Sequence, residues 1–451
     1  MNEQFLLNTA LSRELFDTVR DFPIIDFHNH LTVSDVVENR QFKNVTELWV
    51  TSDPYKLRAM RILGVPERYL TGDADPKEKW AVFVKNLPNL VGNPMYDWTN
   101  LEAERVFGLP GLLNPEKTDE AYETANELLK QPEFSAQGIL SKFKVEYSAP
   151  CAAFGDDFPE VPGLSPSLRT DTLFQNPKGT AEKLGEKYGK TVENSADLFD
   201  VLLRSVKELK AKGLVFTDVS LDSGWRYFEE NGEEETVFRK TFAGEPLTTT
   251  ETFILQSAFL RGIYEIAKKE NLVVQLHMGA ERFTSDRLRR VAGPAGGFAG
   301  IGGVDAASVI ALLRDLENRD VLVQTILYTL NPADYARLSV LSGSFVDAGT
   351  PGFVQLGPAW WWCDHLHGMT TALEEMANYG VLSTFIGMTT DSRSLLSMSR
   401  HEYFRRVLCH YLGEKAERGE LPDSLEVLAP IARKICYENA KEIIGKRGIG
   451  K

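Results

Sequence analysis

The sequence predicts an α/β fold, a (β/α)₈ TIM barrel formed by a single chain of 451 residues. Short apolar runs of strand length alternate with amphipathic stretches of helical length, which is the pattern of parallel strands joined by helices. Eight such runs occur, and eight parallel strands alternating with helices close into a barrel. Each run ends at a polar or aromatic residue, where barrels of this type place their functional groups.

The barrel pattern begins near the N-terminus. Apolar residues recur at helical spacing from Leu11 to Val19, so we expect a helix that ends before Pro23. The first strand follows at residues 24–27 and runs into a His-Asn-His sequence that ends at His30. The first strand therefore carries two histidines at its carboxyl end.

A helical insertion is expected between the first and second strands. The second strand signal appears only at residues 143–147, and helical stretches lie between the two at residues 56–63, 76–86 and 118–130. The insertion is too long for a loop. We expect a distorted barrel that spans residues 1–451 as one unit, with a helical lobe at about residues 35–140.

After the insertion, strand and helix signals alternate to the end of the chain. A glycine-rich segment at residues 297–303 has no lysine, so we interpret it as a flexible loop rather than a phosphate-binding loop. The remaining strands are expected at residues 163–168, 214–217, 272–276, 322–328, 353–356 and 383–388. The helices are expected at residues 195–212, 250–269, 306–318, 366–378, 400–412 and 424–443.

Composition limits the partners and the compartment. The formal net charge of −14 argues against nucleic acid and anionic membranes as partners, because both would be repelled. The N-terminus lacks the features of a secretory signal, and no apolar run reaches membrane-spanning length. The four cysteines form no Cys-x-x-Cys pair, which indicates free thiols in the cytoplasm. An oligomer of identical chains is compatible with these features.

Two histidines and an aspartate form the candidate metal site. Residues two apart on a strand point to the same face, so His28 and His30 can reach one ion. Taken alone, this pattern also fits two surface or capping histidines. Asp391 follows the last predicted strand, which lies beside the first strand in a closed barrel. Two imidazoles and one carboxylate leave open positions on the ion, as catalytic sites do.

The other predicted strand ends also carry polar or aromatic groups. His277 is either a further ligand or acid–base group, or a buried histidine bonded to a backbone carbonyl, and its place favours the first reading. Arg169 and Arg393 either form surface ion pairs or bind a substrate carboxylate, which a guanidinium matches in two-point geometry. We expect the substrate to contact Arg169, Asp171, Asp218, Trp360 and Arg393.

Several stretches resemble the uronate isomerases of the amidohydrolase superfamily over nearly the whole chain. They include Asp-Phe-His-Asn-His-Leu in the first strand, Leu-His-Met-Gly-Ala at residues 276–280, and the segment at residues 387–406. The resemblance implies conversion of an aldohexuronate, such as D-glucuronate or D-galacturonate, to the ketouronate. It also implies one divalent ion, usually Zn²⁺, held by His28, His30 and Asp391.

The absence of two ligands that a second ion would need also favours a site for one ion. Binuclear hydrolases of this superfamily need a lysine at strand four and a histidine at strand six. Here the fourth predicted strand leads into Asp218 and Val219, and the sixth ends at Tyr328.

The chain also departs from the family pattern. Pro54, Asn100 and Val219 stand where the family has histidines, and the segments at residues 148–152 and 167–171 differ from the usual motifs. We therefore expect slow isomerisation of common hexuronates, or a preference for a related sugar acid.

The favoured chemistry is aldose–ketose isomerisation through an enediol. Asp391 and Tyr55 are the candidate proton carriers, His277 is a possible helper, and Arg393 would stabilise negative charge that develops on the substrate. The first rival is a metal-dependent hydrolase of a lactone or another sugar-acid derivative. A second rival is a non-catalytic protein that binds a sugar acid.

Overall fold

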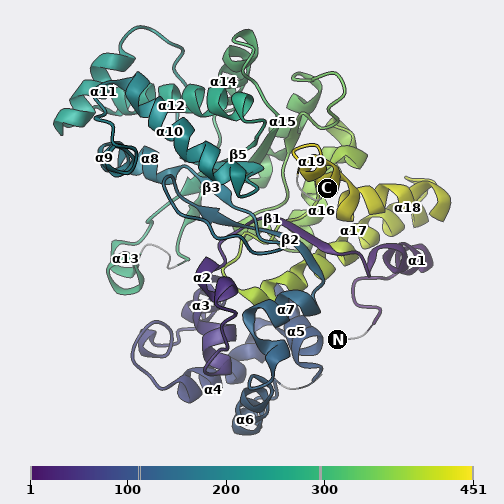
Figure 1. Ribbon diagram of the computed structural model, residues 1–451. Coiled ribbons are helices and arrows are strands. Elements are labelled where there is room, and N and C mark those ends of the chain that lie inside the picture. Colours follow the sequence, from purple (N-terminus) through teal and green to yellow (C-terminus); the bar gives the residue numbers. More distant parts are fainter. Residues whose placement is uncertain (1–2, 110, 112, 294–296, 449–451) are drawn as a thin grey trace.

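A curled parallel sheet forms the centre of the molecule (Figure 1). The computed structural model describes residues 3–109, 111, 113–293 and 297–448. Seven strands pair side by side in parallel, in the order β1-β2-β3-β4-β5-β7-β8, and β6 pairs with β5 in the antiparallel direction. The strands are β1 (Ile24–Asn29), β2 (Val145–Ala152), β3 (Ser167–Arg169), β4 (Phe216–Asp222), β5 (Val273–Glu281), β6 (Gly300–Ile301), β7 (Thr325–Thr329) and β8 (Val354–Leu356). The barrel-type α/β fold is therefore confirmed.

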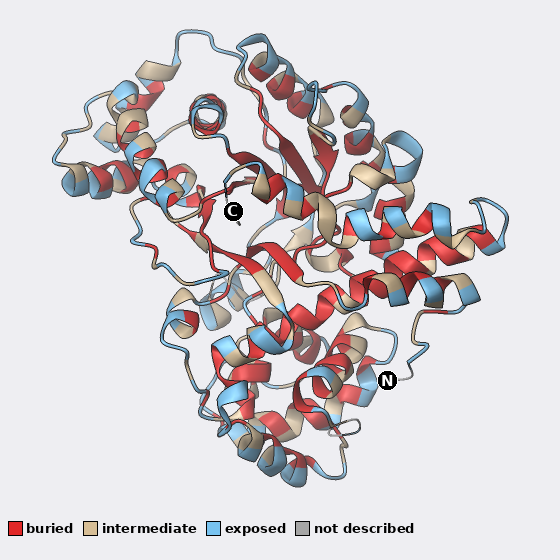
Figure 2. Ribbon diagram, turned by 45° about the vertical axis from the view of Figure 1, so that its right-hand side comes forward, coloured by how far each residue is buried: buried red, intermediate tan, exposed pale blue. Residues whose placement is uncertain are grey.

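Helices cover the outer face of the sheet. Their buried residues face the strands and their exposed residues face solvent, so the core lies between the two layers (Figure 2). The chain enters through α1 (Ala10–Val19), which packs against α17 and α18. The others are α8 (Asp171–Gln175), α9 (Pro177–Tyr188), α10 (Ser195–Ala211), α11 (Glu234–Ala243), α12 (Thr249–Lys269), α13 (Asp286–Ala292), α14 (Ala306–Asn318), α15 (Tyr335–Ser339), α16 (Leu366–Tyr379), α17 (Arg400–Glu417), α18 (Leu425–Arg433) and α19 (Asn439–Gly445).

The first seven predicted strands overlap observed ones, but the predicted carboxyl ends of β2, β4 and β5 lie five residues too early. Strand β4 continues to Asp222 and β5 to Glu281, beyond the apolar runs that predicted them. The added residues stay in the ladder, with Ser220 opposite His277, although both strands end at an exposed carboxylate. Apolar content alone therefore underestimates how far a strand extends toward a polar cavity.

The prediction of an eighth strand at residues 383–388 is wrong, because this segment forms no strand. A short 3₁₀ turn, Leu382–Thr384, leads into irregular chain, and Gly387 adopts a left-handed φ of 96°. A side chain at this glycine would meet the carbonyl of Ile435, which explains the break. The chain nevertheless returns to β1, because the Asp391 N–H donates to the His28 carbonyl at 3.1 Å and the His30 N–H donates to the Ser392 carbonyl at 2.9 Å.

The segment between β1 and β2 folds into helices that gather together in the lower part of Figure 1. Its α5 and α7 pack against the turn Leu395–Ser399, which follows the candidate ligand Asp391. We propose the inserted lobe and the single barrel unit as the domain organisation. Residues 1–2 and 449–451 of that unit lie outside the described residues. The helices of the lobe are α2 (Val33–Val37), α3 (Pro54–Ile62), α4 (Pro76–Asn86), α5 (Pro94–Phe107), α6 (Thr118–Leu128) and α7 (Ala136–Lys142).

Two further expectations can be compared with the structure. The segment at residues 297–303 contains β6, so part of the expected loop is ordered against β5 by the pairing of Ala280 with Ile301. The four cysteines are free, as predicted. Within the described ranges, no helix combines the length and the apolar character needed to cross a bilayer.

Candidate active site

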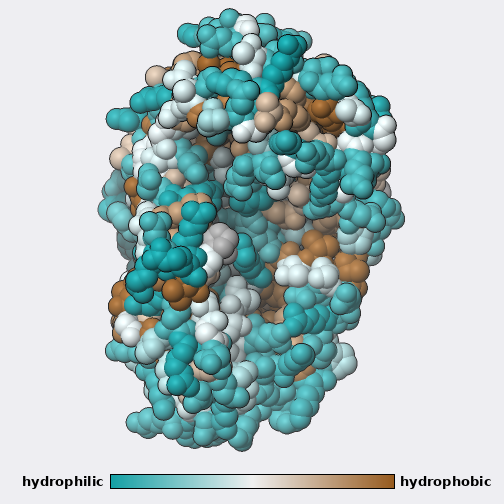
Figure 3. Space-filling view, turned by 90° about the vertical axis from the view of Figure 1, so that its left-hand side faces the viewer, coloured by the Kyte–Doolittle hydropathy of each residue, from teal (hydrophilic) through white to brown (hydrophobic). Residues whose placement is uncertain are grey.

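A cavity opens at the carboxyl ends of the strands, as barrels of this type predict. Figure 3 views the molecule from the side of α3 and α13 and shows this face hollowed between the barrel and the inserted lobe. The cavity is lined by His28, His30, Pro54, Tyr55, Arg169, Asp218, Ser220, His277, Arg282, Phe283, Gly297, Phe298, Ala299, Trp360, Trp361, Trp362, Asp391 and Arg393. Most of the predicted site residues therefore meet in one place.

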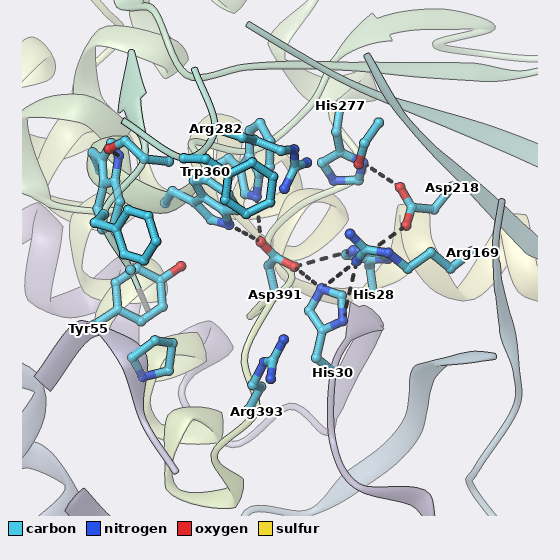
Figure 4. A pocket seen from close by; sticks show the side chains of 18 residues that line it. His28, His30, Tyr55, Arg169, Asp218, His277, Arg282, Trp360, Asp391 and Arg393 are labelled. Carbon is cyan, nitrogen blue, oxygen red and sulfur yellow. Dashed lines mark hydrogen bonds and ion pairs between the residues drawn. The ribbon is translucent and has the colours of Figure 1, made fainter. Parts of the chain in front are cut away.

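The three predicted metal ligands converge (Figure 4). Nε2 of His28 lies 3.3 Å from Oδ1 of Asp391, and Nε2 of His30 lies 2.9 Å from the same oxygen. Burial opposes the charged form of His28, but Asp218 and Asp391 outweigh it and raise the pKa of His28. Burial lowers the pKa of His30, which favours the neutral imidazole that a metal ion needs.

The chemistry of these donors fits a divalent ion. His28 Nδ1 is buried without a hydrogen-bond partner among the described residues, and His28 also belongs to two neighbouring groups, one with Asp218 and His277, the other with His30 and Cys151. We propose His28, His30 and Asp391 as the ligand set, because Oδ1 of Asp391 lies within 3.3 Å of Nε2 of both histidines.

Two consecutive tryptophans hold the other oxygen of Asp391. The indole N–H of Trp361 donates to Oδ2 at 2.9 Å, and the indole N–H of Trp360 donates to the same oxygen. Trp361 and Asp391 both adopt left-handed backbone conformations, with φ of 45° and 46°, which are uncommon outside glycine. Non-glycine residues in this region cluster at functional sites. Trp360 was predicted to contact substrate, whereas its bond to Asp391 was not foreseen.

Arg169 lies between the metal candidates and two carboxylates. Its Nε and Nη2 donate to Oδ2 of Asp171 at 2.9 Å and 2.6 Å, while Nη1 lies 3.1 Å from Nε2 of His30. Asp171 does not line the cavity, contrary to the expectation that it contacts substrate. Its side chain instead lies behind Arg169 and fixes the guanidinium.

His277 and Asp218 form a buried pair next to His28. The His277 ring stacks on Tyr328 at 4.2 Å, and its Nδ1 lies 2.8 Å from Asp218 Oδ1. Burial would raise the pKa of Asp218, but His277, His28 and Arg169 together lower it. Asp218 is therefore ionised, and His277 faces this carboxylate rather than a backbone carbonyl.

Tyr55 and Arg393 complete the predicted set. Asp53 caps the helix that carries Tyr55, and burial next to Asp391 raises the pKa of the Tyr55 phenol well above its usual value. Tyr55 therefore keeps its proton and can donate a hydrogen bond. Arg393 is exposed and forms no ion pair with any described residue, so its charge is available to a ligand.

Two of the three histidine replacements lie outside the cavity. Pro54 lines it, but the amide of Asn100 donates to the Tyr96 carbonyl of its own helix at 2.7 Å and does not reach it. Val219 is fully buried, whereas its neighbours Asp218 and Ser220 line the cavity, because successive residues of a strand face opposite sides. Only Pro54 thus alters the cavity directly.

The sequence reasoning missed one charged residue of the wall, Arg282. The predicted strand ended at Leu276, so the residue just beyond the true end of β5 was not considered. Treating the Gly-Ala-Glu sequence after His277 as a continuing strand would have revealed it. Phe283 and Phe298 were missed as well, and the sequence offers no local signal for them.

Comparisons with known proteins agree on one family. The model of the glucuronate isomerase family matches residues 1–444. The chain is 38% identical to the uronate isomerase of Caldicellulosiruptor saccharolyticus over 99% of each chain, and 36% identical to that of Bacillus pumilus over 98% of this chain and 96% of the relative. The crystal structure of uronate isomerase from Thermotoga maritima superposes with a TM-score of 0.91 at 30% identity, over 98% of this chain and 99% of that one. Glucuronate isomerase from Caulobacter crescentus shares the fold, with a TM-score of 0.88 at 22% identity over 97% and 94% of the two chains.

Proposed function

Because the chain belongs to the uronate isomerase family, we propose that it isomerises a hexuronate of the D-glucuronate or D-galacturonate type to the ketouronate at the cavity described above. The observation that carries the proposal is the convergence of His28 and His30 with Asp391 at the barrel opening. These groups come from opposite ends of the chain, and their meeting in a cavity is the arrangement that such a reaction needs.

His28, His30 and Asp391 would hold one divalent ion, for which we propose Zn²⁺. When bound, such an ion would supply Lewis-acid polarisation of a substrate oxygen. Two imidazoles and one carboxylate suit zinc and leave positions for substrate. The support is the donor set itself, which meets at Oδ1 of Asp391.

The residues of the chain can carry the proton from C2 to C1. We assign the transfer to Asp391 and Tyr55, with His277 and Asp218 beside them. Two indole N–H groups hold Oδ2 of Asp391, so this carboxylate is fixed beside the imidazoles of His28 and His30. The Tyr55 phenol stays protonated and can hydrogen-bond a substrate hydroxyl. Arg169, beside His30, stabilises the negative charge that develops on the enediolate oxygens.

We place the enzyme in the cytoplasm and take a small sugar acid as its partner. The support is the four free cysteines, which suit a reducing compartment, and the net negative charge, which disfavours nucleic acid. Assembly of identical chains stays a prediction.

The test is direct observation of the reaction. Purified protein is incubated with D-glucuronate or D-galacturonate in deuterated water, and NMR follows both ketouronate formation and exchange of the C2 hydrogen. We expect both signals. Hydrolysis of a sugar-acid lactone without C2 exchange would favour the hydrolase alternative, and binding without any turnover would favour the non-catalytic one.

A double variant tests the metal site. The His28→Ala, His30→Ala protein should lose its bound ion and its activity while remaining folded. His365 and His367 have the same spacing but do not line this cavity, so the His365→Ala, His367→Ala protein, which loses the His365 cap of α16, is the matched control. Stoichiometric ion retained in the first variant would exclude His28 and His30 as ligands.

A further inference from the structure

Contacts of the ring set the orientation of Tyr55 on the cavity wall. The Tyr55 hydroxyl points into the cavity (Figure 4) and has no hydrogen-bond partner among the described residues. The ring meets Trp98 and Trp362 edge to face, with ring centres 6.2 Å and 5.9 Å apart. The guanidinium carbon of Arg400 lies 5.3 Å from the centre of the same ring. Because no hydrogen bond fixes the hydroxyl, its direction depends on these neighbours of the ring.

Arg400 is a buried cation with an incomplete set of hydrogen bonds. It is the first residue of α17, and its side chain is only 1% exposed. Its Nη1 donates to Oδ2 of Asp364 at 2.8 Å, whereas Nε and Nη2 have no hydrogen-bond partner among the described residues. The guanidinium carbon also lies 4.5 Å from the centre of the Trp98 ring. A desolvated guanidinium is attracted to the face of an aromatic ring, so the rings of Tyr55 and Trp98 stabilise Arg400 in addition to Asp364.

The contacts of Arg400 connect two parts of the structure that meet at the cavity. Tyr55 belongs to α3 of the inserted lobe. Asp364 ends the short turn that begins at Trp361, and the indole of Trp361 donates to Asp391. One guanidinium therefore contacts both the helix that carries the phenol and the turn that orients the Asp391 carboxylate.

We propose that Arg400 is a positioning residue, which directs the Tyr55 phenol into the cavity and keeps it in register with the turn that carries Trp361. This inference rests on the proposed isomerase function. A buried ion pair often contributes no more stability than apolar side chains of the same volume. Stability alone therefore does not explain a cation that contacts Tyr55 and Asp364 together, whereas the orientation of the phenol does.

A double-mutant cycle with Arg400 and Tyr55 tests the proposal. Arg400→Lys keeps a charge beside Asp364, so the protein should fold, but it removes the planar fork that fits the carboxylate and the rings. We expect kcat for a hexuronate to fall at least about tenfold with KM little changed, because small displacements of a reacting group are costly. In a Tyr55→Phe background, which lacks the hydroxyl, Arg400→Lys should have little further effect. An unchanged kcat in Arg400→Lys, or the same fold loss in both backgrounds, would overturn the proposal.

Arg405 provides the matched control on the same helix. This arginine is also buried, but it donates to the carbonyls of Phe22 and Pro23 at 2.9 Å and 3.0 Å and does not line the cavity. Arg405→Lys should therefore keep kcat. A loss of kcat equal to that of Arg400→Lys would show a general effect of α17 and would contradict a specific role for Arg400.

A measurement on the ring itself separates this proposal from the proposed function. Protein labelled with fluorotyrosine gives a fluorine NMR signal for Tyr55, identified by its loss in Tyr55→Phe. Arg400→Lys should shift this signal, and Arg405→Lys should leave it in place. If the unchanged protein isomerises no hexuronate, the proposed function fails, and the signal still tests the contact on which the positioning role depends. An unchanged Tyr55 signal in Arg400→Lys would overturn that role.

Discussion

The two oxygens of the Asp391 carboxylate contact different groups. Oδ2 accepts from the two indoles, while Oδ1 faces the imidazoles of His28 and His30. Hydrogen bonds to the charged form keep the pKa of Asp391 well below its usual value despite burial. The imidazoles of His28 and His30 therefore keep Asp391 ionised, and the indole donors fix the direction of its carboxylate.

Trp361→Phe tests this role at the scale of one hydrogen bond. The substitution keeps an aromatic wall but removes the N–H that reaches Asp391. A hydrogen bond to a charged group contributes about 1.5–3 kcal/mol. We expect kcat for hexuronate isomerisation to fall about ten- to a hundredfold, with KM little changed.

Trp362→Phe is the control for that experiment. Its indole N–H donates to the Ala299 carbonyl at 3.1 Å, on the same cavity wall but away from Asp391. Steady-state kinetics of the two variants separate the loss of the Asp391 bond from a general change in packing. Equal losses of kcat in both would contradict a specific role for Trp361.

At the scale of elements, α3 is anchored by a buried group of charges. Nζ of Lys56 lies 3.0 Å from Asp53 and 2.9 Å from Glu102 of α5, and all three side chains are almost fully buried. The indole of Trp49 also donates to Glu102. Asp53 caps the helix, and Pro54 and Tyr55 lie between it and Lys56. The inserted lobe therefore positions Tyr55 through this ion group.

The Lys56→Met variant tests whether this buried ion group positions Tyr55. Removing one partner from a buried ion group leaves two carboxylates uncompensated and costs about 3–5 kcal/mol. We expect a lower melting temperature by calorimetry, and a loss of isomerase activity even at temperatures where the variant is folded, since Tyr55 shifts.

An exposed ion pair of the same lobe serves as the comparison. Arg68 and Glu78 lie 3.5 Å apart and are both more than half exposed, so Arg68→Met should change the free energy of unfolding by less than about 1 kcal/mol. A Lys56→Met protein as stable and active as the Arg68→Met protein would show that the buried group does not support the site.

At the scale of the whole molecule, the barrel closes between β1 and the segment around Asp391 without a regular strand ladder. Asp26 of β1 is fully buried and accepts from the Thr390 N–H and from the hydroxyls of Thr389 and Thr390, with His401 at 3.3 Å. The Thr389 hydroxyl lies 2.8 Å from the His28 N–H. Side chains thus complete the closure that backbone pairing leaves unfinished, and they bring Asp391 beside the histidines.

Asp26→Asn tests the closure. The amide replaces one acceptor by a donor among groups that themselves donate, which leaves buried donors unpaired and costs about 2 kcal/mol or more. We expect a lower melting temperature and loss of the bound metal ion, measured by calorimetry and metal analysis. Asp17→Asn, in an exposed pair with Arg20, should change neither. Full metal retention in Asp26→Asn would show that the closure is held elsewhere.

The sequence alone determined the alternation of strands and helices, the insertion after β1, and the identity of the metal-site candidates. These features are local, because strand and helix periods are properties of adjacent residues. His28 and His30 share a face through the strand period, and Asp391 is recognised by its place after a run of apolar residues.

Only the tertiary structure decided how distant groups pair. It replaced the eighth strand with an irregular segment, because Gly387 packs against the carbonyl of Ile435. It directed Asn100 and Val219 away from the cavity, and it placed Arg282 on the cavity wall beside Trp361. These outcomes depend on contacts between residues far apart in the chain, whose geometry is set by packing of the whole molecule and leaves no periodic signal in the sequence.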